Sequence, residues 1–372
     1  MRIGIDARMY GASNSGLGRY VEQLILHLST VQDEHEYVVF LTADKFETFV
    51  LPNTQWKKVL ADVPWYGMRE QMELPRIIKK AHADLMHFPH WNVPLLYRGP
   101  FVLTLHDLIM FHFSRKEATT HGPLVYFIKD RVHRLLVRSS ARRARSIFAT
   151  SEFTKQDIVE TLHIAPEKII VTYQAPFQNK QVSMHNTQSV LETYHVTKPY
   201  ILYVGNAYPH KNLEQLIVAF QNMNKESDGM YQLVLVGKTS QWYTVLEDVA
   251  GFDANIVFTG FVPDDALNEL YDHATLYVFP SLYEGFGLPP LEAMMHGVPV
   301  ISSHASCMPE ILGEGALYFD PESVDDIARA LTEGTRNEDI RYTLRQNAKE
   351  ELKRYSWERL ARQTREVYLR TR

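Results

Sequence analysis

Short apolar runs divide the chain into strand-like segments that alternate with helix-like segments. The runs are continuous rather than alternating, which is typical of strands that are covered on both faces. Strands that alternate with helices predict parallel sheets joined by right-handed crossovers. The expected strands are residues 2–6, 37–41, 58–60, 84–88, 101–105, 147–150, 169–172, 200–204, 232–236, 255–258, 276–279, 298–301 and 316–319.

The helix expected after the first strand is clearly amphipathic. Its apolar stripe consists of Leu17, Val21, Leu24, Ile25 and Leu28. The periodic pattern weakens into a polar segment near residue 178, so we interpret residues 179–198 as a linker. The chain has 372 residues, which is too long for one ordinary core. We therefore predict two doubly wound, Rossmann-like α/β domains, residues 1–178 and 199–355, followed by an amphipathic segment, 356–372.

Composition narrows the class of protein. The formal net charge of −5 gives no indication of general nucleic-acid binding. The single cysteine, Cys307, excludes an intramolecular disulfide and a multi-cysteine metal site, and it fits a reducing compartment. No apolar stretch approaches the length of a membrane span, and the N-terminus does not resemble a signal peptide. We expect a cytoplasmic protein.

The segment 281–297, with the sequence SLYEGFGLPPLEAMMHG, is the most informative part of the chain. It contains two carboxylates eight positions apart, Glu284 and Glu292. The proline pair 289–290 suits the first turn of a helix, and Gly297 suits the position just past its end. Backbone amides near the helix start, those of Phe286, Gly287 and Leu288, would bind phosphate, and the carboxylates would bind sugar hydroxyls.

Polar and glycine residues follow other predicted strands, where ligands of parallel sheets bind. They are Gly16, Gly18 and Arg19 after the first strand, His106 and Asp107 after Leu105, Gly205, His210 and Lys211 after Val204, Gly237 and Lys238 after Val236, and Gly260, Phe261 and Val262 after Phe258. The first loop lacks the third glycine of a dinucleotide site, because Val21 stands there, which disfavours a dehydrogenase.

Each of these signals also has a simple structural interpretation. His106 would be a satisfied core histidine, Lys211 a solvated lysine and Glu292 an ordinary helix-surface charge. A basic segment, 129–145, would be either a solvated helix face or a surface that docks on an anionic membrane. No Asp-x-Asp pair occurs in the chain, which argues against a carboxylate-bound divalent metal.

Taken together, these motifs resemble the retaining family-4 glycosyltransferases of GT-B fold over nearly the whole chain. The resemblance rests on GLGRY at 16–20, HDL at 106–108, TSEFT at 150–154, YVGNAYPHKNL at 203–213, FTGFV at 258–262 and EGFGLPPLE at 284–292. It implies that the two domains face a central cleft. It also implies that a last helix, beginning at SWE 356–358, crosses back to the N-terminal domain.

The resemblance implies roles for these residues. Glu284 would contact the transferred sugar, Glu292 the nucleotide ribose, and Lys211 the diphosphate. The donor would also meet Gly16, Gly18, Gly205, His210, Gly237, Lys238, Phe261, Val262, Phe286, Gly287 and Leu288. His106 would lie beside the reacting carbon. The leaving phosphate would take the acceptor proton, without a metal or other cofactor.

The donor and acceptor follow less directly from this resemblance. The Pro-His-Lys-Asn sequence at 209–212 resembles bacterial mannosyltransferases of cell-surface polysaccharide or glycolipid assembly, which favours GDP-mannose over UDP-glucose or another UDP-hexose. Acceptor candidates are Arg19, Trp65, Tyr66, Glu70, Gln71, His90, Trp91 and Asp107. Alternatives are a GT-B phosphorylase or epimerase and an inactive sugar-nucleotide-binding paralogue. The partners expected are a nucleotide sugar, a glycan or lipid-linked acceptor and, through 129–145, the inner face of the membrane.

Overall fold

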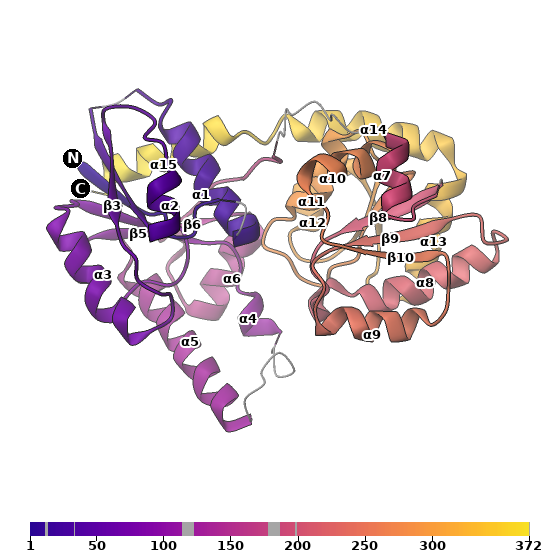
Figure 1. Cartoon of the computed structure of the whole chain (residues 1–372), viewed down its shortest axis with the longest axis horizontal. Helices are drawn as coiled ribbons and strands as arrows, with labels where there is room; N and C mark the ends of the chain where they lie inside the picture. Colours follow the sequence, from indigo (N-terminus) through magenta and orange to yellow (C-terminus); the bar gives the residue numbers. More distant parts are fainter. Residues whose placement is uncertain (12–13, 33, 114–122, 178–186, 198, 372) are drawn as a thin grey trace. The chain divides into compact units, whose positions relative to one another are not determined.

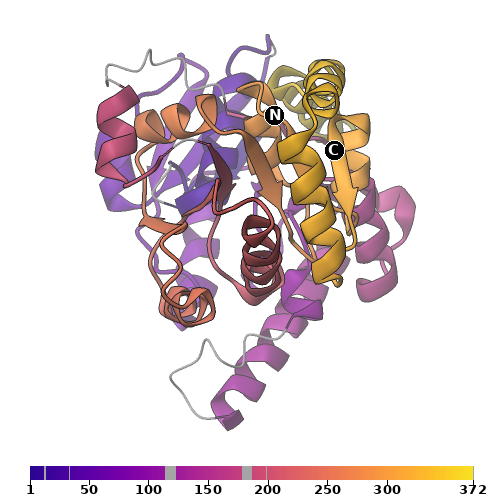
Figure 2. The same cartoon turned by 90° about the vertical axis from the view of Figure 1, so that its right-hand side faces the viewer.

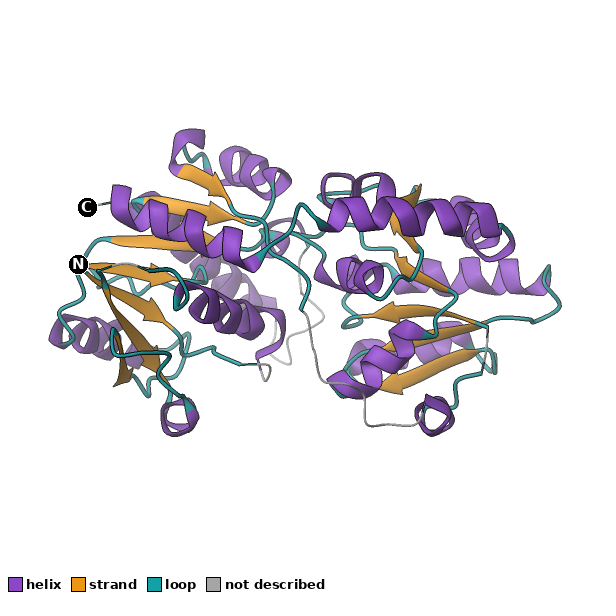
Figure 3. Ribbon diagram, turned by 90° about the horizontal axis from the view of Figure 1, so that it is seen from above, coloured by secondary structure: helices purple, strands orange, loops and turns teal. Residues whose placement is uncertain are grey.

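The structure is a computed structural model that describes residues 1–371 except 12–13, 33, 114–122, 178–186 and 198. The chain divides into two compact units (Figure 1). Unit 1 is Met1–Gln174 together with Ser356–Arg372, and unit 2 is Ala175–Tyr355. Each unit has its own parallel sheet with helices on both faces (Figure 3), as the continuous apolar strands predicted.

The sheet of unit 1 has seven strands in the order β3-β2-β1-β4-β5-β6-β7. They are β1 (Arg2–Asp6), β2 (Glu36–Leu41), β3 (Trp56–Leu60), β4 (Leu85–Phe88), β5 (Phe101–Leu105), β6 (Ser146–Ala149) and β7 (Ile169–Val171). The connections contain α1 (Ser15–Leu28), α2 (Ala43–Thr48), α3 (Met68–Lys80), α4 (Ile109–His112), α5 (Pro123–Arg143), α6 (Glu152–Leu162) and η3 (Pro166–Lys168). The predicted stripe of α1 is confirmed, because Val21, Leu24, Ile25 and Leu28 are buried.

The last helix, α15 (Trp357–Arg370), completes unit 1. It lies against α1 and buries Leu360, Ala361 and Tyr368. The Tyr368 hydroxyl lies 2.6 Å from Nδ1 of His87 on β4. The predicted return of the C-terminal helix to the first domain is therefore confirmed.

The sheet of unit 2 has six strands in the order β10-β9-β8-β11-β12-β13. They are β8 (Tyr200–Val204), β9 (Gln232–Val236), β10 (Ile256–Gly260), β11 (Leu276–Phe279), β12 (Val300–Ser303) and β13 (Ala316–Phe319). The other elements are α7 (Thr187–Thr193), η4 (Pro209–Lys211), α8 (Leu213–Lys225), α9 (Gln241–Ala250), α10 (Asp264–Asp272), α11 (Leu288–Met295), α12 (Met308–Leu312), η5 (Gly313–Gly315), α13 (Val324–Arg336) and α14 (Glu338–Leu352).

The segment 179–198 differs from the predicted linker. Its described part contains the helix α7, which belongs to unit 2 and contacts α10. Val190, Leu191 and Val196 are buried there, so a few apolar residues anchor a helix within an otherwise polar segment. Unit 2 begins at Ala175, before the predicted start at 199. Residues 178–186 and 198 lie outside the described part of the chain.

Candidate functional site

The loop between β11 and α11 places Glu284 at the carboxyl edge of the second sheet. β11 is fully buried between β8 and β12, so the loop leaves the middle of the sheet. Gly287 ends the loop with φ 89°, a conformation that favours glycine, and α11 begins at the next residue. Pro289 and Pro290 occupy its first turn and Gly297 lies just past its end, as predicted.

Glu284 forms an ion pair with Lys211 of η4. The Lys211 Nζ lies 2.5 Å from Glu284 Oε1, and their side chains are 17% and 11% exposed. The same Nζ lies 5.5 Å from the centre of the Phe279 ring, at the end of β11. The backbone N–H of Leu282 also donates to the carbonyl of His210 at 2.8 Å. The loops that follow the neighbouring strands β8 and β11 are thus joined by an ion pair and by a backbone hydrogen bond.

The second carboxylate, Glu292, lies on α11 rather than on the loop. It is half-buried, and its Oε2 accepts a hydrogen bond of 3.4 Å from the Tyr271 hydroxyl. Tyr271 is buried on α10. The two carboxylates therefore have different supports: Glu284 is paired with a cation, whereas Glu292 is bonded to a neutral phenol.

The glycines after β8 and β9 are required by close packing between their own loops. A Cβ atom added to Gly237 would lie 2.1 Å from the carbonyl oxygen of Gly205. A Cβ atom added to Gly205 would lie 2.6 Å from the Tyr203 hydroxyl. Lys238, in contrast, is exposed beside them. Close packing alone therefore explains why Gly205 and Gly237 are glycines, without any contact to a phosphate.

The remaining predicted donor residues of unit 2 differ in accessibility. His210 is buried, with its ring stacked on Tyr208 at 5.8 Å, and this burial does not favour a direct phosphate contact. Phe261 is 64% exposed after β10, whereas Val262 is buried. Phe286 is also buried, and its ring packs edge-on against Tyr355. Of the two donor contacts predicted after β10, Phe261 is therefore more accessible than Val262.

In unit 1, His106 follows β5 and is held by hydrogen bonds on both ring nitrogens. Its Nε2 lies 2.9 Å from the carbonyl of Pro89, and its Nδ1 lies 3.4 Å from Nε2 of Gln174. Because a carbonyl only accepts, the proton belongs on Nε2 of the His106 ring. Burial lowers the pKa of His106 to about 4, so the ring is neutral at pH 7. Its own carbonyl accepts a bond from the Thr150 hydroxyl at 2.8 Å.

The two glycines of the motif after β1, which lie in the first turn of α1, are only partly constrained by packing. A Cβ atom on Gly18 would lie 2.0 Å from the carbonyl oxygen of Gly11, so only glycine fits there. Gly16 is exposed, and an added Cβ atom would meet nothing within 4 Å. Arg19 is half-buried in the next turn. Gly16, rather than Gly18, therefore leaves room for a ligand.

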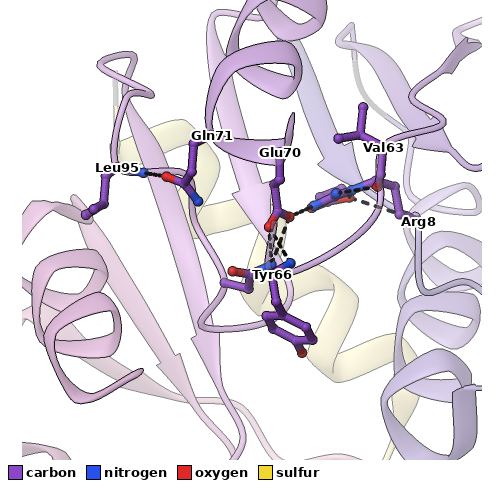
Figure 4. Close-up of polar contacts among 8 residues, drawn as sticks. Arg8, Val63, Tyr66, Glu70, Gln71 and Leu95 are labelled. Atoms are coloured by element: carbon purple, nitrogen blue, oxygen red, sulfur yellow. Dashed lines mark hydrogen bonds and ion pairs between the residues drawn. The ribbon is translucent and has the colours of Figure 1, made fainter. Parts of the chain in front are cut away.

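Glu70, a predicted acceptor residue, is instead the centre of a buried network (Figure 4). Its side chain has no exposed surface, and Arg8 Nη2 lies 2.7 Å from its Oε1. Arg8 also bonds to Asp6 at 2.7 Å, and Asn92 donates to both oxygens of Glu70. Oε2 of Glu70 also accepts a hydrogen bond from the backbone N–H of Tyr66 at 2.8 Å. These contacts make Glu70 a structural carboxylate rather than the acceptor contact that we expected.

Gln71 and Asp107 also bond to nearby backbone. Gln71 Oε1 accepts the N–H of Leu95 at 2.7 Å (Figure 4), and Asp107 Oδ1 accepts the N–H of Ile109 at 3.0 Å. Both side chains are half-buried, and these bonds fix a loop and the start of α4. A structural role is therefore sufficient to account for both residues.

An aromatic cluster brings together three other acceptor candidates. Tyr66 stacks on Trp91 at 5.3 Å, and Trp91 contacts His90 at 4.7 Å. Tyr66 is 59% exposed, whereas burial lowers the pKa of His90 to about 3. Trp65 precedes Tyr66 in sequence and lines a surface pocket with Asp62 and Arg69. Trp65, His90 and Trp91 are half-buried, so Tyr66 is the most accessible of these aromatic residues.

Several residues that support the site were not identified from the sequence. Arg8 and Asn92 hold Glu70, and Asp6 in turn holds Arg8. Ser306 and Cys307 contact the backbone of Glu284. No motif in the sequence distinguishes them. The one available signal was the position of Arg8, two residues after Asp6 at the end of the first predicted strand. Within the described ranges, no three His, Cys, Asp or Glu side chains form a group suited to a metal ion.

Two family models together match most of the chain. Residues 14–175 match the model "Glycosyltransferase Family 4", and residues 168–351 match "Glycosyl transferases group 1". The two matches correspond closely to the two sheets. Both sets of strand-end residues described above therefore lie within matched regions.

Two curated relatives extend over most of the chain. The "O-antigen chain mannosyltransferase B" of Escherichia coli is 31% identical over 95% of this chain and 96% of its own. The "O-antigen chain mannosyltransferase RfbU" of Salmonella typhimurium is 26% identical over 86% of each.

Among solved structures, sucrose-phosphate synthase from Thermosynechococcus elongatus has a TM-score of 0.75. It is 17% identical, and the match covers 100% of this chain and 98% of that one. At this identity the likeness concerns the fold alone, and it confirms the predicted GT-B architecture.

Proposed function

Because the chain belongs to the family-4 glycosyltransferases, we propose that it transfers a mannosyl residue from GDP-mannose to a hydroxyl of a glycan or lipid-linked acceptor. Glycosyl transfer follows from the family, and the mannosyl part rests on the two O-antigen mannosyltransferases. The guanine nucleotide rests on the resemblance of the sequence at 209–212. We further propose that the product is part of a cell-surface polysaccharide.

The observation that carries the proposal is the Lys211–Glu284 pair at the carboxyl edge of the second sheet. A nucleotide sugar offers a diphosphate to the ammonium and hydroxyls to the carboxylate, side by side. The amides at the start of α11 add partial positive charge at the same edge. The site thus combines the two kinds of group that such a donor requires.

In the proposed reaction, the bond between the sugar carbon and the leaving phosphate oxygen breaks. A bond from the same carbon to the acceptor oxygen forms on the same face, so configuration is retained. The acceptor proton passes to the leaving phosphate, and no protein base is required. Lys211 and the amides of α11 stabilise the charge that develops on the diphosphate. His106, neutral at pH 7, would orient groups without adding charge.

A thermal-shift screen with GDP-mannose, UDP-glucose and ADP-glucose tests the donor. A ligand at a hundredfold its dissociation constant stabilises the folded protein by about 2.7 kcal/mol, which distinguishes a cognate donor. We expect GDP-mannose to give the largest shift, and transfer of radiolabelled mannose to an O-antigen-like acceptor to follow. A larger shift with UDP-glucose would contradict the assignment of GDP-mannose as the donor. If no sugar is transferred from any of the three nucleotide sugars, the proposed transferase function is wrong.

We also propose that α5 docks unit 1 on an anionic membrane. Its first half extends away from the rest of unit 1 (Figures 1 and 2). Four of its apolar side chains are exposed by 49% to 61%: Phe127, Ile128, Val132 and Leu135. Lys129 and Arg131 lie among them in sequence, and Arg138 and Arg142 follow further along the helix. Apolar side chains beside cations complement the acyl and anionic layers of a lipid surface.

None of the helices in the described part of the chain has the length and apolar character needed to span a bilayer. The proposed contact through α5 is therefore peripheral. It would place the acceptor-binding unit at a surface that carries lipid-linked glycans.

A further inference from the structure

The turn between β12 and α12 contacts the loop that carries Glu284. The hydroxyl oxygen of Ser306 accepts the backbone N–H of Glu284 at 3.0 Å. The thiol of Cys307 donates to the carbonyl of the same residue at 3.3 Å. Met308 packs on the end of the loop, because a Cβ atom added to Gly287 would lie 2.5 Å from its Cε. Three consecutive residues thus hold the middle of the loop at Glu284 and its last residue, Gly287.

The conformation of this turn is unusual for its sequence. Ser306 has φ 52°, in the left-handed region that non-glycine residues seldom adopt. Such a conformation costs about 1 kcal/mol or more and persists only where the surroundings impose it. In this conformation the Ser306 hydroxyl meets the amide of Glu284. The strain is therefore coupled to a contact with a site residue.

The chemistry of Cys307 fits the role of a hydrogen-bond donor. The side chain has no exposed surface. Burial, together with the nearby charge of Glu284, raises the pKa of the thiol well above its usual value. The thiol therefore keeps its proton and donates it to the carbonyl. It has no access to an external electrophile, and the proposed transfer does not use it.

We propose that Ser306 and Cys307 are positioning residues that fix the backbone of Glu284, so that its carboxylate faces Lys211 and the sugar. The proposal rests on the function proposed for Glu284 above. Both backbone polar groups of Glu284, its N–H and its carbonyl, are bonded to these side chains, which restricts rotation of the backbone that carries the carboxylate. A loop carboxylate needs such support, since small displacements of a site residue weaken its interactions strongly.

Binding measurements on matched probes test the proposal. Calorimetry would compare GDP-mannose with GDP, and UDP-glucose with UDP, for wild type, Ser306→Ala, Cys307→Ala and Cys307→Ser. Ser302→Ala is the control, because this buried hydroxyl on β12 bonds to the carbonyl of Ser303 and not to the loop. We expect Ser306→Ala and Cys307→Ala to bind the nucleotide sugar about three- to tenfold more weakly. Binding of the nucleotide alone should change less than about twofold, and Cys307→Ser should restore most of the loss.

A double-mutant cycle tests whether Cys307 acts through Glu284. In a Glu284→Ala background, Cys307→Ala should have almost no further effect on binding of the nucleotide sugar. Three results would overturn the positioning role. They are an equal loss of affinity for nucleotide and nucleotide sugar, additive effects in the double-mutant cycle, and a loss of affinity in Ser302→Ala as large as in the loop-contacting variants. If wild type binds neither nucleotide sugar more tightly than its nucleotide, the assignment of Glu284 to the sugar is wrong. That result appears in the wild-type data alone, so the two failures are distinguishable.

Discussion

The ion pair between Lys211 and Glu284 joins two residues that we expected to serve different parts of a donor. In this arrangement each side chain holds the other in place. A ligand that replaces one partner would meet a side chain that is already ordered, which lowers the entropic cost of binding. Because its side chain is only 17% exposed and paired with Glu284, Lys211 is not the solvated lysine of the simple structural interpretation, and the pairing fits the functional one.

Lys211→Ala should reduce kcat/KM by about a hundredfold or more, because it removes the cation proposed to stabilise the leaving diphosphate. Initial-rate kinetics with the nucleotide sugar would measure the effect. Lys225→Ala is a matched control, since this lysine is exposed at the end of α8. Activity of Lys211→Ala within about threefold of wild type, in the folded variant, would contradict the assignment.

His87 provides a pH-dependent prediction about stability. Its Nε2 lies 2.8 Å from the Thr104 hydroxyl, and burial lowers its pKa to about 3. The unfolded chain takes up this proton near pH 6.5, so the contribution of neutral His87 is complete above that pH. It decreases as the pH falls from 6.5 towards 3.

The His87→Gln variant should therefore be less stable than wild type at pH 7, and the difference should shrink as the pH approaches 5. Each pH unit below 6.5 removes up to about 1.4 kcal/mol of the contribution. Thermal melts at several pH values would measure it. A difference that grows on acidification would contradict the lowered pKa.

The supports of Glu284 show why part of the site was not predictable. Ser306 and Cys307 are 22 and 23 positions away in the chain. They meet Glu284 because β11 and β12 pair in register, with Phe279 opposite Ser302. The sequence predicts that both strands exist but does not determine which turn residues then meet. The acceptor prediction for Glu70 was wrong for a related reason. The sequence around an exposed glutamate and a buried one looks the same until the positions of Arg8 and Asn92 are known.

Among the elements, strands were predicted better than the segments between them. The thirteen predicted apolar runs correspond to the thirteen strands found in the described part of the chain, because a strand buried on both faces leaves a continuous apolar signal. The ends differ by a few residues: β12 begins at Val300, after Pro299, which has no N–H to donate. The short helix α7 escaped prediction because so few of its residues are apolar.

The α5 helix supports a prediction about membrane binding. A Val132→Glu/Leu135→Glu double variant should lose most of its co-sedimentation with vesicles that contain anionic phospholipid, because it places charge on the exposed apolar face. Wild type should bind such vesicles at low salt and release them as salt rises. Substituting Val245, an exposed apolar residue of α9, by glutamate is the control. Wild type that fails to bind anionic vesicles at low salt would contradict the docking surface.

At the scale of the whole molecule, the proposed reaction needs positive charge to stabilise the leaving diphosphate. The chain has a net charge of −5 and no Asp-x-Asp pair. We therefore expect Lys211 and the start of α11 to stabilise the leaving diphosphate without a divalent ion. Transfer should retain most of its rate in excess chelator. Loss of activity in chelator that magnesium restores would contradict this prediction.

Unit 1 consists of two stretches separated by the whole of unit 2, and this has a consequence for synthesis. The ribosome makes β4 long before α15, so His87 lacks its Tyr368 partner until 281 further residues have been added. Unit 2 is continuous, so its sheet is fully available before the first unit has its final helix. We expect nascent chains to complete the sheet of the second unit before the first unit acquires α15.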